Sequence, residues 1–350
     1  MLTKEQLHEI KGWLERSQNP VFFFDNDLDG LSSFLLLRRF INRGKGVAIK
    51  SFPDLSVAYV RKLHELKPDV VFILDKPIVS EGFINAAREM GLPIVWIDHH
   101  PLQQISEGIY YFNPLQNEPK TMEPVAYWCY KAVETEKDLW IAMLGCLADW
   151  FLPDFTDKFQ KKYSDIFSNF KNVEEAMYKT EFGKLLKLLN FALKDKTSSV
   201  VKLLRDLYHV DSPYDLLREN SKFEKTVKHA DSVTKKYDAL IEKAKEIAEN
   251  TKDRLLFFRY GGTLSLSGDL SNEIYYNYPD RIVVVAYVTG EKVNISLRGN
   301  IDIRIVVKKA LEGIEGTGGG HEHACGSTIS LKDLLKYIEN IQNYLKTLKN

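Results

Sequence analysis

The chain has 350 residues, and its 48 Lys and Arg balance 48 Asp and Glu, so that its formal net charge is zero. A hydrophobic share of 44% with 27% charged residues is typical of globular proteins and excludes a disordered or collagen-like chain. No apolar run approaches the roughly 20 residues that a transmembrane helix needs. The first ten residues carry charges where a signal peptide needs an apolar core. We therefore expect a cytoplasmic protein without membrane association.

The charge balance and the cysteines exclude further classes. A neutral chain is not basic all over, so any binding of nucleic acid needs a local cluster of charge. The three cysteines are widely spaced and odd in number, which provides neither a disulfide framework nor a pair of zinc ligands. We expect Cys146, inside an apolar run, to lie in the core.

The first 150 residues alternate short apolar runs with amphipathic segments. The apolar runs are predicted strands, and each is too apolar to have a face in water: Val21–Phe24, Val47–Phe52, Val70–Leu74 and Ile94–Ile97. The segments between them have helical spacing: Ser32–Asn42, Val57–Leu66 and Glu81–Met90. This alternation predicts an α/β domain with a parallel sheet covered on both faces. In such a sheet, ligands bind at the carboxyl ends of the strands.

The rest of the chain changes character twice. Residues 155–250 have helical spacing and end in one long amphipathic stripe between Phe223 and Ile247. Strands then return, at Leu255–Phe258, Ile282–Tyr287 and Val293–Leu297, before a glycine cluster and a terminal helix that starts at Leu331. We predict three parts: a parallel-sheet domain (1–154), a helical insertion with a connector helix (155–250), and a smaller mixed α/β domain (251–350).

Acidic residues and histidines follow three of the predicted strands and one apolar segment. They are Asp25, Asp27 and Asp29 after the first strand, Asp75 after the third, Asp98-His99-His100 after the fourth, and Asp149 after the apolar segment. Carboxylates that share a small site repel one another unless cations neutralise them. Carboxylates with one or two imidazoles suit Mn²⁺ or Mg²⁺ better than structural zinc. The pattern predicts a metal cluster, and a pair of such ions can assist phosphoryl transfer.

Each of these segments has another interpretation when it is taken alone. Residues 25–30 match the opening of an EF-hand calcium loop, but Leu36 occupies the twelfth position, where that loop needs Glu. Asp75 could be a turn residue, Asp149 a helix cap, and the His pair a polar surface feature. Their joint occurrence at the ends of elements favours the metal cluster.

Together, these segments resemble the four N-terminal motifs of the DHH phosphoesterase superfamily, closest to the RecJ-like nucleases and the nanoRNases. The C-terminal part resembles the DHH-associated substrate domain of that family, through residues 294–298 and 318–324. No motif covers residues 155–250. The resemblance implies a site with two manganese ions, for which magnesium is an alternative.

The resemblance also implies roles for single residues. Asp25 and Asp27 would bind one ion, Asp29, His99 and Asp149 would bind the other, and Asp75 would bridge the two. Asp98 would orient an imidazole, and His100 would face the substrate, so that Asp75, His99 and His100 form the catalytic group. In the C-terminal domain the substrate would contact Ser296, Arg298, Gly318, Gly319, Gly320 and His321.

The residues themselves support part of this second assignment. A glycine run lets backbone N–H groups approach a phosphate, and Arg298 offers a two-pronged donor. The run is not a Walker loop, because no Gly-Lys-Ser/Thr follows it. A plain loop and a solvated arginine at a strand end are the alternatives.

We therefore predict a manganese-dependent phosphodiesterase or exonuclease that releases mononucleotides from an end of single-stranded RNA or DNA, or of short oligonucleotides. Two alternatives stay open. One is a hydrolase of small phosphates, such as cyclic dinucleotides, phosphoadenosine phosphate or pyrophosphate. The other is a subunit of a replication or RNA-processing assembly, and a homodimer is a further form that the resemblance allows. The choice of RNA or DNA and the polarity stay open too.

Overall fold

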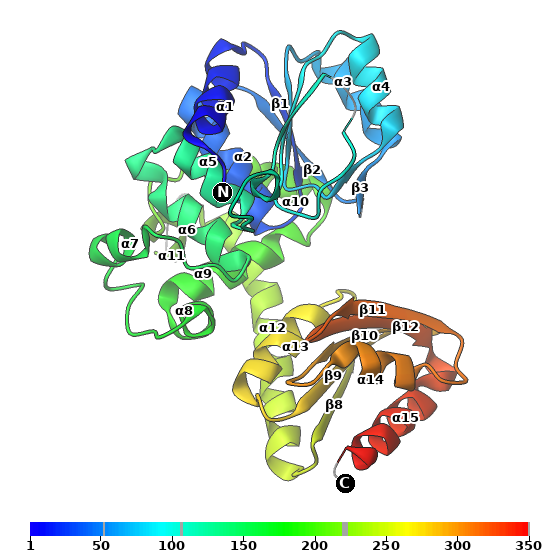
Figure 1. The fold of residues 1–350 in the computed structure, drawn as a ribbon. Coiled ribbons are helices and arrows are strands. Elements are labelled where there is room, and N and C mark those ends of the chain that lie inside the picture. The colour runs from blue at the N-terminus through cyan, green and yellow to red at the C-terminus, as the bar shows by residue number, and fades with distance from the viewer. Residues whose placement is uncertain (52, 106–107, 219–222, 349–350) are drawn as a thin grey trace. The chain divides into compact units, whose positions relative to one another are not determined.

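The computed structural model describes residues 1–51, 53–105, 108–218 and 223–348. The chain forms two compact units, Met1–Ala230 and Asp231–Asn350, and the division falls inside helix α12 (Glu224–Asn250) (Figure 1). Each unit contains its own five-stranded sheet. Within the described ranges, no helix is both long enough and apolar enough to cross a membrane.

The sheet of the first unit is entirely parallel, with the strand order β2-β1-β4-β6-β7. Its strands are β1 (Val21–Asp25), β2 (Lys45–Ile49), β4 (Val71–Leu74), β6 (Ile94–Ile97) and β7 (Ile109–Phe112). This confirms the predicted α/β class and four of the strands, although β2 ends before Phe52, which lies outside the described residues. Strand β7 was not predicted from the sequence, because it is a four-residue strand at the sheet edge whose Tyr110 is exposed.

Alternate side chains of each strand enter two separate hydrophobic cores. Phe22 and Phe24 pack on one side of the sheet against α1 (Lys4–Arg16), α2 (Leu28–Ile41), α5 (Val125–Val133) and α6 (Leu139–Ala148). Phe23 packs on the other side against α3 (Val60–Leu66) and α4 (Glu81–Glu89). A pair of two-residue strands, β3 (Asp54–Leu55) and β5 (Ile78–Val79), forms a small second sheet. Burial on both faces explains why the strands are apolar throughout.

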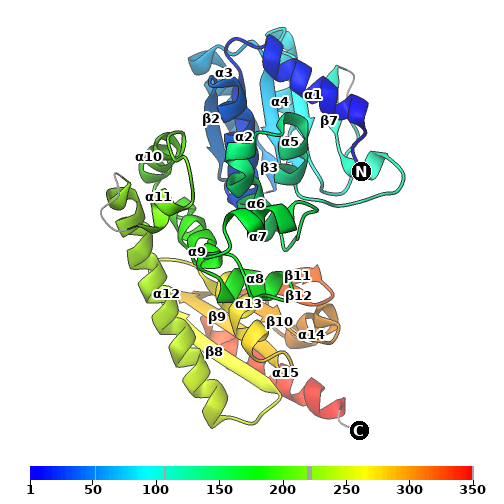
Figure 2. The ribbon, with the colours of Figure 1, turned by 90° about the vertical axis from the view of Figure 1, so that its left-hand side faces the viewer.

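The helical segment packs onto the same core as α2, α5 and α6. It consists of α7 (Thr156–Lys162), α8 (Val173–Lys179), α9 (Glu181–Leu193), α10 (Thr197–Leu207) and α11 (Tyr214–Leu217). Buried Arg39 of α2 pairs with Asp138 at 2.8 Å and donates to the carbonyl oxygens of Leu207, Tyr208 and Val210. It therefore holds the C-terminal end of α10 against α2, so that α10 lies beside the edge strand β2 (Figure 2).

The second unit has a mixed sheet with the order β11-β12-β10-β9-β8. Its strands are β8 (Leu255–Gly261), β9 (Ile282–Thr289), β10 (Lys292–Arg298), β11 (Gly316–His321) and β12 (Ala324–Ser330), and only the β8–β9 pair is parallel. Helices α14 (Ile303–Ala310) and α15 (Leu334–Thr347) cover one face. Helix α13 (Ser267–Asn277) contacts β9 and β10. The glycine cluster is therefore an exposed edge strand and not a loop.

Candidate active site

The three aspartates at the end of β1 and the start of α2 are positioned by direct packing of α2 on the end of that strand. Asp27 is the N-cap of α2, and its Oδ1 accepts the N–H of Gly30 at 2.9 Å. A Cβ on Gly30 would lie only 2.4 Å from the carbonyl oxygen of Asp25. Glycine is therefore required for this approach, and α2 begins four residues earlier than the helix predicted from Ser32. Asp25 ends the strand and Asp29 lies in the first helical turn.

Asp29 is fully buried and held by the N-terminus of another helix. Its two carboxylate oxygens accept the backbone N–H groups of Val125 and Ala126, at 2.8 and 2.7 Å, at the start of α5. The positive end of a helix favours a carboxylate at this place. The carboxylate keeps a fixed orientation, and each oxygen retains a lone pair for a cation.

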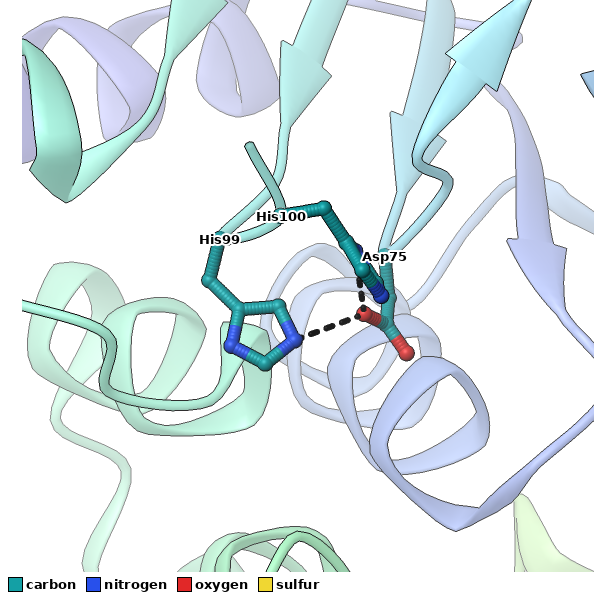
Figure 3. A group of neighbouring side chains, drawn as sticks. All are labelled: Asp75, His99 and His100. Carbon is teal, nitrogen blue, oxygen red and sulfur yellow. Dashed lines mark ion pairs between the residues drawn. The ribbon is translucent and has the colours of Figure 1, made fainter. Parts of the chain in front are cut away.

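Asp75 follows β4 in a strained backbone conformation. Its φ of 57° lies in the left-handed region, which is costly for a residue other than glycine and is often retained at functional sites. Its Oδ1 lies 3.4 Å from Nε2 of His99 and 3.8 Å from Nδ1 of His100, and both imidazoles turn toward it (Figure 3). This oxygen is buried without a hydrogen bond from any described residue, which suits a metal ligand.

His99 connects Asp75 to the end of α6. Its Nε2 lies 3.3 Å from Oδ2 of Asp149, the C-cap residue of that helix. Two sets of possible metal ligands therefore share His99, namely Asp75 with His99 and His100, and Asp29 with His99 and Asp149. Within each set, the donor atoms lie within 4.8 Å of one another. Carboxylate oxygens with imidazole nitrogens fit Mn²⁺ or Mg²⁺.

The pKa values show how strongly these carboxylates repel one another. Burial and the charge of Asp75 raise the pKa of Asp27 and Asp29 well above the usual value and that of Asp149 to about 6. Burial favours a neutral imidazole at His99, but Asp75 and the other carboxylates raise its pKa to about 10. Burial would raise the pKa of Asp75, but His99 and His100 lower it. Excess negative charge is the signature of a cation site.

Two predicted ligands, Asp25 and Asp27, belong to neither of these two sets. They are nevertheless neighbours of the cluster, because the charges of Asp75 and Asp25 raise the pKa of Asp27. A buried cation, Lys76, was not predicted and lies beside them, with its Nζ 3.1 Å from Oδ1 of Asp25 and 2.8 Å from the carbonyl oxygen of Ser51. The only sequence signal was its position directly after Asp75.

A buried polar network orients His100. Asp98 accepts from Nδ1 of His100 at 2.8 Å and from its backbone N–H at 3.2 Å. Asn113, which follows β7, donates to the carbonyl oxygen of His100 at 2.9 Å and to the hydroxyl of Tyr111 at 2.8 Å. Tyr111 and Asn113 were not predicted as site residues because β7 was not predicted, although Asn113 is another polar residue directly after a strand.

In the second unit, strand register aligns four predicted residues on one face of the sheet. Ser296 and Gly319 are both paired with Gly326, while Arg298 and His321 are both paired with Ala324. Residues two apart in a strand share a face, so these two rows are adjacent. Helix α13 holds the polar side chains, because Ser296 Oγ donates to Ser267 at 3.0 Å and Arg298 Nε donates to Asn272 at 2.6 Å. Neither α13 residue had a sequence signal.

The glycines of β11 differ in what they contact. A Cβ on Gly318 would lie 2.6 Å from the side chain of Val307. Gly320 has a φ of 147°, and a Cβ there would lie 2.5 Å from the carbonyl oxygen of Ala324. Both positions therefore need glycine for the fold. A Cβ on Gly319 would meet nothing within 4 Å, and the strand is exposed along its length. The open space lies at Gly319, on the same face as Arg298 and His321.

Each of the two units contains a region that matches the model of a known protein family. A model described as "DHH family, N-terminal domain" matches residues 21–148, and a model described as "DHHA1 domain" matches residues 257–349. The chain belongs to the DHH phosphoesterase superfamily. Its members are metal-dependent phosphoesterases, and this chain combines both domains. No match was found among curated protein sequences.

Solved structures share this fold at low sequence identity. RecJ from Thermus thermophilus in complex with Mn²⁺ is 13% identical with a TM-score of 0.65, covering 98% of this chain but 55% of RecJ. An exonuclease RecJ bound to manganese is 14% identical with a TM-score of 0.63, covering 98% and 94% of the two chains. A pGpG-specific phosphodiesterase from Vibrio cholerae is 13% identical with a TM-score of 0.51, covering 94% and 99%.

Proposed function

We propose that this DHH protein is a manganese-dependent phosphodiesterase that removes mononucleotides from an end of single-stranded nucleic acid or short oligonucleotides. The observation that carries the proposal is the pair of possible metal-ligand sets that share His99. One of them contains Asp75, whose buried Oδ1 has no hydrogen bond from a described residue. A cytoplasmic location is part of the same proposal.

The donors suit two divalent ions. We assign Asp29, His99 and Asp149 to one ion, Asp25 and Asp27 to the other, and Asp75 to both. Two bound ions, when present, stabilise the charge that develops on the attacking and leaving oxygens of a phosphoryl transfer. The buried positions of Asp29 and Asp75 keep these carboxylates dehydrated, which strengthens their attraction to cations.

His100 and Arg298 are the residues that we assign to the substrate. Since Asp98 engages Nδ1 of His100, Nε2 is the ring nitrogen left to donate to a phosphate oxygen or to the leaving oxygen. In the second unit, Arg298 donates from Nε to Asn272 and from Nη1 to the carbonyl oxygen of Leu297, which fixes its guanidinium, and a guanidinium is a strong donor to phosphate. The open backbone at Gly319 and the imidazole of His321 complete the proposed nucleotide site.

A second candidate is hydrolysis of a dinucleotide or another small phosphate. It is favoured by the similarity to the pGpG-specific phosphodiesterase, which extends over 94% of this chain. The similarity to two RecJ structures, with TM-scores of 0.65 and 0.63, favours the polymer. The substrate therefore has to be decided by relative turnover.

The decisive experiment is a product ladder. RNA and DNA oligonucleotides labelled at one end or the other are incubated with purified protein and Mn²⁺, next to a dinucleotide, a cyclic dinucleotide, phosphoadenosine phosphate and pyrophosphate. We expect stepwise shortening from one end, release of mononucleotides and no reaction with Asp75→Ala. Exclusive turnover of a small phosphate would replace the proposal with the second candidate. Full activity of Asp75→Ala would refute both.

The assembly state belongs to the same proposal. A homodimer, or a place in a DNA-replication or RNA-decay complex, is compatible with an active DHH centre. Light scattering of the purified protein distinguishes a monomer from a dimer. The chain has a suitable residue at every proposed ligand position, which argues against a purely scaffolding role. Isothermal titration with Mn²⁺ tests this, and no binding at micromolar concentrations would favour the scaffolding role.

A further inference from the structure

A large basic groove lies along the free edge of the first unit's sheet. It has a volume of about 1100 Å³ and is bounded by β2, by the turn and helix at residues 56–66, and by α10. Six cationic side chains line it, and no acidic residue does among the described residues that form its walls. They are Arg38, Lys45, Lys50, Arg61, Lys62 and Arg205. For a chain with zero net charge, this is the local cluster that binding of a polyanion requires.

Most of these cations lack an acidic partner. Lys62 pairs with Glu65, and Lys50 donates to the carbonyl oxygen of Asp195 at 2.9 Å. For the other four, the described part of the chain provides no ion pair. Arg38 is the clearest case, because its guanidinium stacks on Tyr208 at 3.8 Å while its buried Nε has no hydrogen-bond partner among the described residues. An unsatisfied buried donor on a charged group is costly unless a ligand completes it.

The groove is rigidly built. Arg39, next to Arg38 in α2, holds the end of α10 by three hydrogen bonds to carbonyl oxygens. On the opposite wall, a Cβ on Gly46 would lie 2.5 Å from the ring of Phe34, so that β2 lies directly on α2. Arg38, Arg205 and Tyr208 line the same space, and the charges of the two arginines oppose the rise that burial causes in the pKa of Tyr208. The cations therefore surround a defined space.

One end of the groove reaches the metal centre. Asp25 is paired in register with Ile49, so Lys50 and Ser51 follow β2 at the same edge where the metal ligands lie. The carbonyl oxygen of Ser51, a lining residue, accepts from Lys76, which in turn pairs with Asp25. From there the groove follows β2 to Gly44, and the five residues of β2 alone span about 15 Å at the usual rise of a strand.

We propose that this groove binds the phosphate backbone of a single-stranded nucleic acid next to the nucleotide that is hydrolysed. The inference rests on the proposed function and selects a polymer as the substrate. Several cations without an acidic partner along one groove match a chain of phosphates, and the exposed apolar surface of Val201 with the ring of Tyr59 provides contacts for bases. A dinucleotide held at the metal centre would leave the Lys45 end empty.

Binding without catalysis tests the groove directly. The variant Lys45→Glu/Arg205→Glu reverses two exposed charges that make no ion pair with a described residue, at the β2 and α10 walls. The control Lys4→Glu/Lys120→Glu makes the same net change at two exposed lysines, one at the start of α1 and one after β7. Fluorescence anisotropy in EDTA measures the Kd of each protein for a labelled dinucleotide, a tetramer and a dodecamer, with thermal unfolding to verify the fold.

We expect the groove variant to bind the dodecamer about tenfold more weakly at low salt, and to lose about 0.7 of the slope of log Kd against log salt for each phosphate contact removed. The loss should grow with oligonucleotide length, and the control should bind as the wild type does. The proposal for the groove would be overturned if the groove variant bound the dodecamer within about twofold of the wild type. An equal loss in the control would also overturn it, because bulk charge would then account for binding.

This readout is separate from the proposed function. If the wild type fails to cleave oligonucleotides with Mn²⁺ but the groove variant loses dodecamer binding, the proposed function is wrong and the proposal that the groove binds nucleic acid is supported. If the wild type cleaves oligonucleotides and the groove variant binds every length as the wild type does, the proposal that the groove binds nucleic acid is wrong and the proposed function is supported.

Discussion

The two sheets of this protein present polar residues in two different ways. In the parallel sheet of the first unit, candidate metal ligands follow the strands, so neighbouring residues such as His99 and His100 reach one site together. In the mixed sheet of the second unit, the candidate substrate residues lie within strands, where successive side chains point to opposite faces. Ser296 and Arg298 therefore share a face that Leu297 does not.

This difference determines how a motif has to be interpreted. After a parallel strand, consecutive polar residues can all be functional. Within an antiparallel strand, only every second residue can face the same site. The run Gly318-Gly319-Gly320 therefore divides into two glycines that the fold requires and one that faces open space. Gly326, paired with both Ser296 and Gly319, belongs to the same face although no sequence signal marked it.

The largest effect is expected at the strand-end site. Asp75→Asn keeps the size of the side chain but removes the negative charge of the carboxylate that we assign to both ions. A loss of several kcal/mol of transition-state stabilisation corresponds to a fall on the order of 1000-fold in Mn-dependent hydrolysis. Steady-state kinetics measures this fall, with exposed Asp157→Asn in α7 as the control. Activity near that of the control would show that the strand-end carboxylates do not form the reaction site.

A smaller effect is expected one step further from the ions. Asp98→Asn removes the negative charge that holds Nδ1 of His100, but preserves the shape of the buried network. Loss of such a supporting carboxylate costs about 10–100-fold in activity. Because Asp98 is a positioning residue, the pH dependence of kcat should change as well, and a purely structural role would leave that profile unmoved.

The strand-face site is tested by a matched pair of glycine variants. Gly318→Ala forces a Cβ against Val307 and should lower the free energy of unfolding by about 1–3 kcal/mol. Gly319→Ala enters open space, so its stability should equal that of the wild type while KM for an oligonucleotide rises. Thermal unfolding and kinetics of both variants measure the two effects. Equal destabilisation by both would show that the face is not open at Gly319.

The smallest effect is the dependence of stability on pH. The raised pKa values mean that the metal-free folded protein retains protons that the unfolded chain releases. For Asp149 this range extends from 3.8 to about 6, and Asp25, Asp27 and Asp29 shift in the same direction. Stability of the EDTA-treated protein should therefore fall as the pH rises through this range. His99 adds no slope there, because it is protonated in both states below its ordinary pKa of 6.5.

Manganese reverses this trend, because it replaces the protons that the carboxylates would otherwise retain. The rise in Tm on adding Mn²⁺ should be larger at neutral pH than near pH 4. Calorimetry with EDTA and with Mn²⁺ across the range measures this difference. A rise in Tm that is the same at every pH would contradict the placement of the ion among these carboxylates.

The sequence predicted the first unit well because buried parallel strands are unusually apolar and their ends are marked by charged residues. It missed β7, which is short and has an exposed tyrosine, and with it Asn113 of the His100 network. It also started α2 at Ser32, because an acidic segment with a glycine has the composition of a loop. Contact between Gly30 and the backbone of Asp25 decides otherwise. The three-part domain division stays a prediction.

The sequence by itself determined the fold class, the family and the residues that end the strands, since hydrophobic periodicity and short motifs are local properties. Three features were decided only by tertiary structure: the buried Lys76 beside Asp25, the shared face of Ser296, Arg298, Gly319 and His321, and the basic groove along β2. Each depends on strands and helices that are distant in the sequence. The groove cations come from α2, β2, α3 and α10, so no window of the sequence contains the cluster that they form.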